Sequence, residues 1–258
     1  MRFTSQTLLL IVLAVGLSWT SAAQAQTVWH YLHKADLPPG EIGQRQLQRG
    51  GPLPGYFQPV QVTAPNGALI SLACDGTFVE PVREKALAGM LIGPVYRLKV
   101  SNIDKHEGVE VFPTIEVIDR LYPPPGQATR FPIPIVLTQE ELEFAAEGRY
   151  VVRVIYVEEP RTAIPVREIP GQQRYNEIMP GQDAMELADR LGRPVAILRM
   201  GSRVPAEGEN GKFLYESPPL VRFEEPVAVP RNRGLEEPML APPQMGRPTR
   251  NFPRTAIR

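Results

Sequence analysis

Apolar and polar side chains alternate with a period of two between residues 95 and 120. Tyr96, Leu98 and Val100 fall on one side of this segment, whereas Arg97 and Lys99 fall on the other. Such alternation is typical of a strand with one buried and one solvated face, which favours an antiparallel sheet. The next stretch predicts a buried face of Val109, Val111, Pro113, Ile115, Val117 and Asp119, and a solvated face of Glu110, Phe112, Thr114, Glu116, Ile118 and Arg120.

Turn signals and prolines separate further strand-like runs. Asn66-Gly67 and Asp75-Gly76 each lie between apolar runs, which predicts two hairpins. In the run between them, Ile70, Leu72 and Cys74 form the more apolar face. The run "FPIPIVL" carries two prolines, which are typical of an edge strand or a bulge.

The stretch 137–160 joins a short helix to a long strand. Thr138 followed three residues later by Glu141 is a capping box, and Gly148 marks the helix end. This helix, with Tyr150 opening the next strand, resembles the E–F corner of an immunoglobulin-like β-sandwich. The resemblance implies that the helix crosses between two sheets and that the Tyr150 hydroxyl bonds back to the corner backbone. It implies no activity.

The chain divides by composition into five parts. Arg2, the apolar run Leu8–Leu17 and the small residues Ala23 and Ala25 predict a signal peptide over residues 1–25, cleaved after Ala25. Residues 26–55 are expected to be a flexible linker, residues 56–160 an antiparallel β-sandwich of immunoglobulin type, residues 161–203 an irregular connection with a helix–strand appendage, and residues 204–258 a proline-rich disordered tail.

Inside the appendage Asp183 is a candidate helix cap, and Gly192 is the expected helix end. Met185, Ala188 and Leu191 share one face of this helix. We expect the strand that follows Pro194 to join the sheet, or the helix to cover it. The arginines near the end of the tail, Arg247, Arg250, Arg254 and Arg258, are expected to be solvated.

Charge and cysteine content exclude some classes of protein. Lys and Arg total 28 and Asp and Glu total 28, which argues against a general nucleic-acid binder. Cys74 is the single cysteine, so no internal disulfide forms and stability must come from a packed core. We expect Cys74 to be a buried structural residue.

Few residues indicate chemistry. The sequence has no phosphate-binding loop and no nucleophile elbow. His30 and His33 have a spacing that would let them share a metal on a helix, but they lack a nearby third ligand, and His106 lies in an expected loop. We therefore expect no catalytic residue, no metal ligand and no cofactor.

Two sequence stretches, "YRLKVSNIDKHEGVEVFPTIEVIDRLYPP" and "GRPVAILRMGSR", resemble uncharacterised exported proteins of planctomycete-type bacteria, which carry no function to transfer. Together with the signal peptide, this favours a non-enzymatic binding or structural module of the periplasm or cell envelope. Its expected partner is an envelope protein or a glycan. Two alternatives are a carbohydrate-binding module and a metal-dependent hydrolase that uses His30, His33 or His106.

Overall fold

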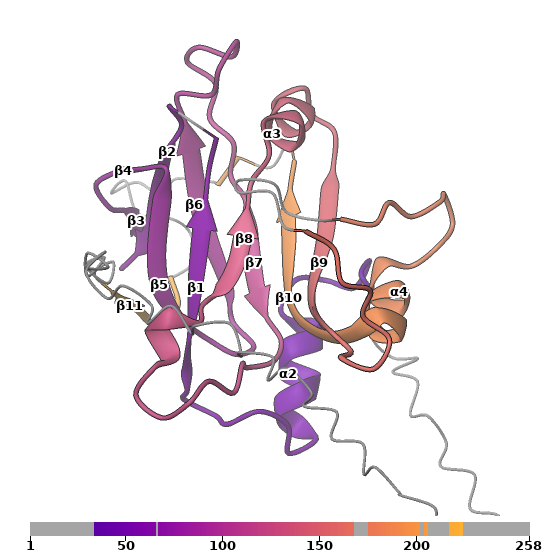
Figure 1. Cartoon of the computed structure of the whole chain (residues 1–258). Helices are drawn as coiled ribbons and strands as arrows, with labels where there is room; N and C mark the ends of the chain where they lie inside the picture. Colours follow the sequence, from indigo (N-terminus) through magenta and orange to yellow (C-terminus); the bar gives the residue numbers. More distant parts are fainter. Residues whose placement is uncertain (1–33, 66, 168–174, 202–203, 206–216, 224–258) are drawn as a thin grey trace, which may run out of the picture. The chain divides into compact units, whose positions relative to one another are not determined.

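Two β-sheets form the framework of the computed structural model, which describes residues 34–65, 67–167, 175–201, 204–205 and 217–223 (Figure 1). The first sheet has the strand order β11 (Leu220–Arg222), β5 (Lys85–Leu91), β1 (Phe57–Thr63) and β8 (Ile133–Val136). The second runs β3 (Thr77–Phe78), β2 (Leu69–Cys74), β6 (Val95–Ser101), β7 (Thr114–Val117), β10 (Gly192–Met200) and β9 (Val151–Glu158), and β4 (Val82–Arg83) also pairs with β2. The predicted mainly β, two-sheet fold is confirmed, although β1 and β8 pair in parallel.

The two sheets meet over one hydrophobic core. Val60 and Met90 from the first sheet belong to the same buried cluster as Ile70, Leu98 and Ile115 from the second. The predicted alternation in β6 is confirmed, because Tyr96, Leu98 and Val100 are buried and their neighbours are half-buried. The edge position predicted for the proline-containing strand is also confirmed, since β8 ends the first sheet.

A second core lies on the outer face of the larger sheet. Helices α2 (Glu41–Gln48) and α4 (Ala184–Leu191) contribute Ile42 and Met185, which pack with Ile118 and Ile197. This covering corrects the prediction of a solvated face, because Ile118 and Glu116 are both buried. Strands β7 and β10 are therefore buried on both faces, unlike a strand with one face in water.

Helix α3 (Gln139–Ala146) connects β8 in one sheet to β9 in the other, with a short 3-10 helix, η1 (Ala128–Arg130), preceding β8 (Figure 1). The capping box is present: the Thr138 side chain accepts the Glu141 N–H at 3.2 Å, and a Glu141 carboxylate oxygen accepts the Thr138 N–H at 3.0 Å. Gly148 has φ of 85° just past the helix, which is the left-handed conformation that favours glycine there.

Tyr150 does not fulfil the role that the resemblance implies. Tyr150 is 67% exposed and lies just before β9, an edge strand of its sheet. Among the described tyrosines the buried one is Tyr96, whose hydroxyl donates to the Pro219 carbonyl and accepts the Leu91 N–H, both at 2.7 Å. Tyr96 thus ties β6 to the first sheet and to the segment that enters β11.

One of the two predicted hairpins is present. Asp75 and Gly76 form the two-residue turn between β2 and β3, both with positive φ. The turn at Gly67 instead joins β1 to β2, which belong to different sheets, and Asn66 lies outside the described residues. Cys74, expected to be buried, is only half-buried because its strand ends at the turn.

Two predicted boundaries differ from the structure. Helix α2 lies within the predicted linker, because Ile42 finds an apolar site on the sheet. As expected, the strand after Pro194 joins the larger sheet, where β10 is an internal strand between β7 and β9. Strand β11 lies within the predicted tail and pairs with β5. The signal peptide with Ala23 and Ala25, and the terminal arginines, lie outside the described residues.

No helix in the described ranges is both long and apolar enough to cross a bilayer.

Candidate functional site: a cleft on the outer face of the larger sheet

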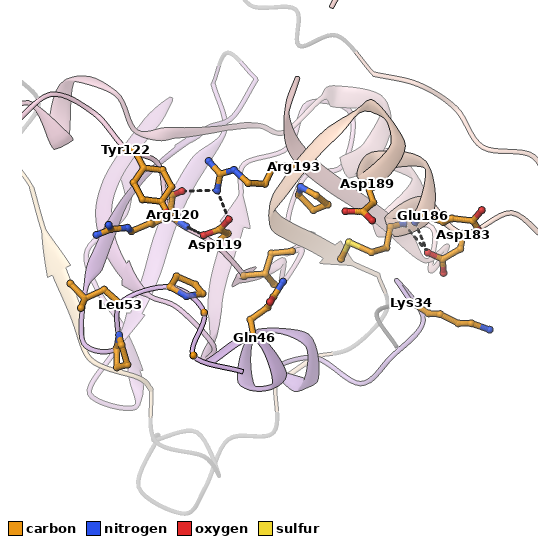
Figure 2. A pocket seen from close by; sticks show the side chains of 17 residues that line it. Lys34, Gln46, Leu53, Asp119, Arg120, Tyr122, Asp183, Glu186, Asp189 and Arg193 are labelled. Carbon is orange, nitrogen blue, oxygen red and sulfur yellow. Dashed lines mark hydrogen bonds and ion pairs between the residues drawn. The ribbon is translucent and has the colours of Figure 1, made fainter. Parts of the chain in front are cut away.

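A cleft of about 870 Å³ opens where the end of β7, helix α4 and the segment after α2 meet (Figure 2). Its volume is typical of a site for a small ligand or a short chain segment. Its lining side chains are Lys34, Gln46, Pro52, Leu53, Pro54, Ile118, Asp119, Arg120, Tyr122, Asp183, Met185, Glu186, Asp189, Arg193 and Pro194, together with Gly50 and Gly51.

The first wall is the segment that follows β7. The N–H groups of Ile118 and Asp119 both donate to the Val195 carbonyl, at 2.9 and 3.2 Å, beside an irregularity in the pairing of β10 with β9. The buried Gln58 side chain accepts the Leu121 N–H at 2.7 Å. Irregularities of this kind redirect side chains, and beyond the end of β7 Asp119, Arg120 and Tyr122 line the cleft, whereas Leu121 packs against the core.

Tyr122 organises two guanidinium groups on this wall. The guanidinium carbon of Arg120 lies 4.5 Å from the Tyr122 ring centroid and 5.5 Å from that of Tyr56, and the guanidinium carbon of Arg193 lies 5.3 Å from the Tyr122 ring centroid. Arg193 also forms an ion pair with Asp119 and donates to the Arg120 carbonyl at 2.9 Å. The charge of Arg193 is therefore neutralised, whereas no carboxylate among the described residues pairs with Arg120.

Helix α4 forms the opposite wall and carries acidic side chains. Asp183 caps this helix as predicted, with one oxygen accepting the N–H groups of Met185 and Glu186. Its other oxygen accepts the Ala35 N–H at 3.0 Å, which attaches the start of the described chain to the helix.

The remaining acids on α4 differ in their pairing. Glu186 pairs with Arg190 at 3.7 Å. Asp189 has no ion-pair partner within the described ranges. This wall is therefore negative, and Figure 2 shows it across the cleft from Tyr122 and Arg120.

The floor is apolar and depends on two glycines after α2. Gly50 has φ of 74°, and a Cβ on Gly51 would lie 2.4 Å from the Gln46 carbonyl oxygen. Other residues at these positions would be strained or would clash, so the chain turns sharply here. The turn places Pro52, Leu53 and Pro54 at the cleft, where Leu53 remains 55% exposed.

The lining of the cleft combines charged, amide and apolar side chains. The residues that line the described cleft include no serine, threonine, cysteine or histidine. Asp119 is neutralised by Arg193 and Asp183 caps α4, while Glu186 and Asp189 project from the same helix. Catalytic carboxylate pairs face each other across the bond that they cleave, which two side chains of one helix wall do not do.

The residues singled out by sequence lie elsewhere. His106 lies in the loop after β6 and does not line the cleft. Its backbone N–H donates to the Ile103 carbonyl. His30 and His33 lie outside the described residues. Within the described ranges, no group of three or more His, Cys, Asp or Glu side chains gathers around a common point.

Two other candidate groups have shifted pKa values. Burial, and then the charge of Asp75, raise the pKa of the Cys74 thiol, which disfavours the nucleophilic thiolate. Glu141 lies in α3, with Thr138 before the helix and Gly148 and Tyr150 after it. Arg153 on β9 donates to both Glu141 carboxylate oxygens, at 2.9 and 3.1 Å. Burial lowers the pKa of Arg153, and the charge of Glu141 opposes that shift.

Sequence reasoning missed Arg120, Tyr122, Arg193 and Asp189 as site residues. The one available signal was local, since Arg120 and Tyr122 are two residues apart immediately before three prolines. The partners of this pair come from α4 and β10, more than sixty residues later in the chain. Their convergence therefore required the tertiary structure.

Comparison of the chain with protein-family models, with curated proteins and with solved structures found no match. The fold and the site together define a two-sheet β protein with a charged cleft on its outer face.

Proposed function

We propose that this protein is a non-enzymatic exported binding module of the cell envelope that holds its ligand in the cleft between Tyr122 and α4. The observation that carries the proposal is the cleft itself, which combines an apolar floor with polar groups at its rim. Sites of this composition bind ligands through apolar contact area and use a few polar groups for orientation. The apolar segment at the N-terminus supports export.

The rigidity of both walls also supports binding. Asp183, Gln58 and the pair Asp119–Arg193 fix the backbone around the cleft before any ligand arrives. Preorganised walls reduce the entropy that a ligand must otherwise offset on binding. An envelope protein segment or a glycan is the expected partner, and nucleic acid is not.

A carbohydrate-binding module is the second candidate, and Tyr122 favours it. The Tyr122 ring is 65% exposed at the cleft, as are the aromatic rings on which sugars stack. However, two guanidinium groups already lie near that ring. The third candidate, a metal-dependent hydrolase, would depend on His30, His33 or His106, of which His106 lies away from the cleft.

The proposal is tested with two matched tyrosine variants. Tyr122→Ala removes an exposed ring that lines the cleft, whereas Tyr150→Ala removes a similarly exposed ring outside it. Each protein is incubated with peptide and glycan fractions of an envelope digest, and retained molecules are identified by native mass spectrometry. We expect wild type and Tyr150→Ala to retain the same molecule and Tyr122→Ala to lose most of it.

Equal retention by all three proteins would place binding outside the cleft. Retention of nothing from either fraction, by protein shown to be folded, would argue against a binding module. Conversion of a retained molecule into a cleaved product would instead support the hydrolase.

A further inference from the structure

Two half-buried charges of opposite sign line the cleft without ion-pair partners among the described residues, and Lys34, which has no such partner either, is exposed. Arg120 is held by the rings of Tyr56 and Tyr122 and forms no ion pair, and Asp189 on α4 forms none. Each is half-buried. In Figure 2, Arg120 lies on the side of Leu53 and Tyr122, and Asp189 lies on the side of α4. The cleft therefore has a positive end and a negative end.

The space between these ends is electrically neutral and largely apolar. Asp119 and Arg193 neutralise each other, Ile118, Met185 and Pro194 supply apolar lining, and Gln46 is uncharged. A ligand that filled the cleft would exclude water from both unpaired charges. Because an unpaired charge that loses water is costly, the ligand should supply a counter-charge at each end.

We infer that the ligand is an extended peptide segment with a carboxylate and a basic group separated by apolar residues. Its carboxylate accepts hydrogen bonds from Arg120, its ammonium or guanidinium group binds Asp189, and its apolar residues cover Leu53, Ile118 and Met185. This inference rests on the proposed function and names its ligand class. Arg120 suits the carboxylate because a guanidinium presents a planar fork of donors to two oxygens.

The charge pattern distinguishes this ligand from the alternatives. A neutral oligosaccharide would leave Arg120 and Asp189 without counter-charges, and a purely acidic or purely basic chain would meet one wall of its own sign. Like charges brought together in this way weaken binding and suppress the wrong partners. The structure thus favours a dipolar chain over a uniform one.

The probes are fluorescent peptides with blocked ends, each carrying one Glu and one Lys separated by two, four or six residues of Pro, Leu and Ala, in both orders. Control peptides carry Gln in place of Glu, of Lys or of both, or carry two Glu or two Lys. Affinities for the full mature chain are measured by fluorescence anisotropy. We expect at least one dipolar peptide to bind about tenfold more tightly than its doubly neutral counterpart, since hydrogen bonds to charged groups are the stronger ones.

Variants of Arg120 and Asp189 show which charge of the peptide binds at each end of the cleft. Arg120→Gln should weaken binding of the dipolar peptide about tenfold and leave the affinity for the peptide without Glu unchanged. Asp189→Asn should likewise weaken binding of the dipolar peptide about tenfold and leave the affinity for the peptide without Lys unchanged. Asp189→Lys should shift the preference to the peptide with two Glu residues. Arg130→Gln and Asp104→Asn change exposed charges that do not line the cleft and serve as matched controls.

Equal affinity for dipolar and neutral peptides, or no binding by any peptide of the set, would overturn the inference. If a neutral oligosaccharide from the envelope digest then binds and Tyr122→Ala abolishes that binding, the proposed binding module stands and only its ligand class is wrong. If neither peptide nor digest fraction binds, both proposals fail.

Discussion

Glu116 and Arg199 form a buried ion pair beneath helix α2, with a carboxylate oxygen of Glu116 2.9 Å from Nη1 of Arg199. The side chain of Glu116 is 0% exposed and that of Arg199 is 3% exposed. The other carboxylate oxygen accepts the Gly43 N–H of α2 at 2.8 Å. A charged pair on the outer face of β7 and β10 thus anchors the helix that leads into the cleft floor.

Removal of either charge should destabilise the protein strongly. Arg199→Leu or Glu116→Leu leaves the other charge buried without its partner, and we expect each to lower the free energy of unfolding by about 3–5 kcal/mol. Urea unfolding followed by circular dichroism measures this change. A loss below about 1 kcal/mol would show that water reaches the remaining charge.

The double variant Glu116→Leu with Arg199→Leu is the control for that experiment. Nε and Nη2 of Arg199 have no hydrogen-bond partner among the described residues, so the pair itself carries a desolvation cost. We therefore expect the double variant to be more stable than either single variant, because apolar replacements often compensate for a buried pair. Additive losses would contradict this expectation.

Gly43→Ala should separate α2 from the sheet. A Cβ at this position would lie 2.5 Å from the Cα of Gly93, and the obstacle is backbone that moves little. We expect a loss of about 1–3 kcal/mol in the free energy of unfolding, although alanine favours helix formation. Gln44→Ala, on the exposed side of the same helix, should be neutral or slightly stabilising in the same denaturation assay. Equal stability of the two variants would show that α2 packs less closely.

Tyr96 should make the protein sensitive to alkali. Burial raises the pKa of its hydroxyl from 10.0 to about 12. The unfolded chain therefore loses this proton first, so stability is fully present below about pH 10, falls between about pH 10 and 12, and levels off above. The shift corresponds to roughly 2–3 kcal/mol over that interval.

Tyr96→Phe tests this prediction through its slope with pH. The variant should be less stable at pH 7 by about 1–3 kcal/mol, because the Leu91 N–H and the Pro219 carbonyl lose their partner. Its stability should nevertheless decline less steeply than that of wild type between pH 10 and 12, measured by urea unfolding at each pH. Parallel declines would assign the alkaline sensitivity to other groups.

Asp183→Ala should loosen the acidic wall of the cleft. The variant loses the cap of α4 and the acceptor of the Ala35 N–H, so we expect a loss of about 1–2 kcal/mol in unfolding free energy. Amide hydrogen exchange should also accelerate at Ala35. Thr138→Ala, which removes only the cap of α3, should show a similar loss of stability without faster exchange at Ala35. Unchanged protection of Ala35 in Asp183→Ala would contradict the role of this carboxylate.

Several elements in the central region could be predicted because their signals are local. The alternation in β6, the turn at Asp75 and Gly76, and the capping box of Thr138 with Glu141 each depend on residues that are near one another in the chain. The role of Tyr150 could not be predicted from such signals. Its burial depends on what packs around the start of β9, which is an edge strand that pairs only with β10 among the described strands.

The sequence by itself determined that this protein is mainly β, where several of its strands and helices begin and end, and which face of β6 is buried. Only the tertiary structure decided that Glu116 and Ile118 are buried and that Arg120 faces an acidic helix across a cleft. The physical reason is separation along the chain. Glu116 meets Gly43 and Arg199 from 73 and 83 residues away, and Asp183 meets Ala35 across 148 residues. Contacts of that range depend on how whole layers pack, which local propensity does not specify.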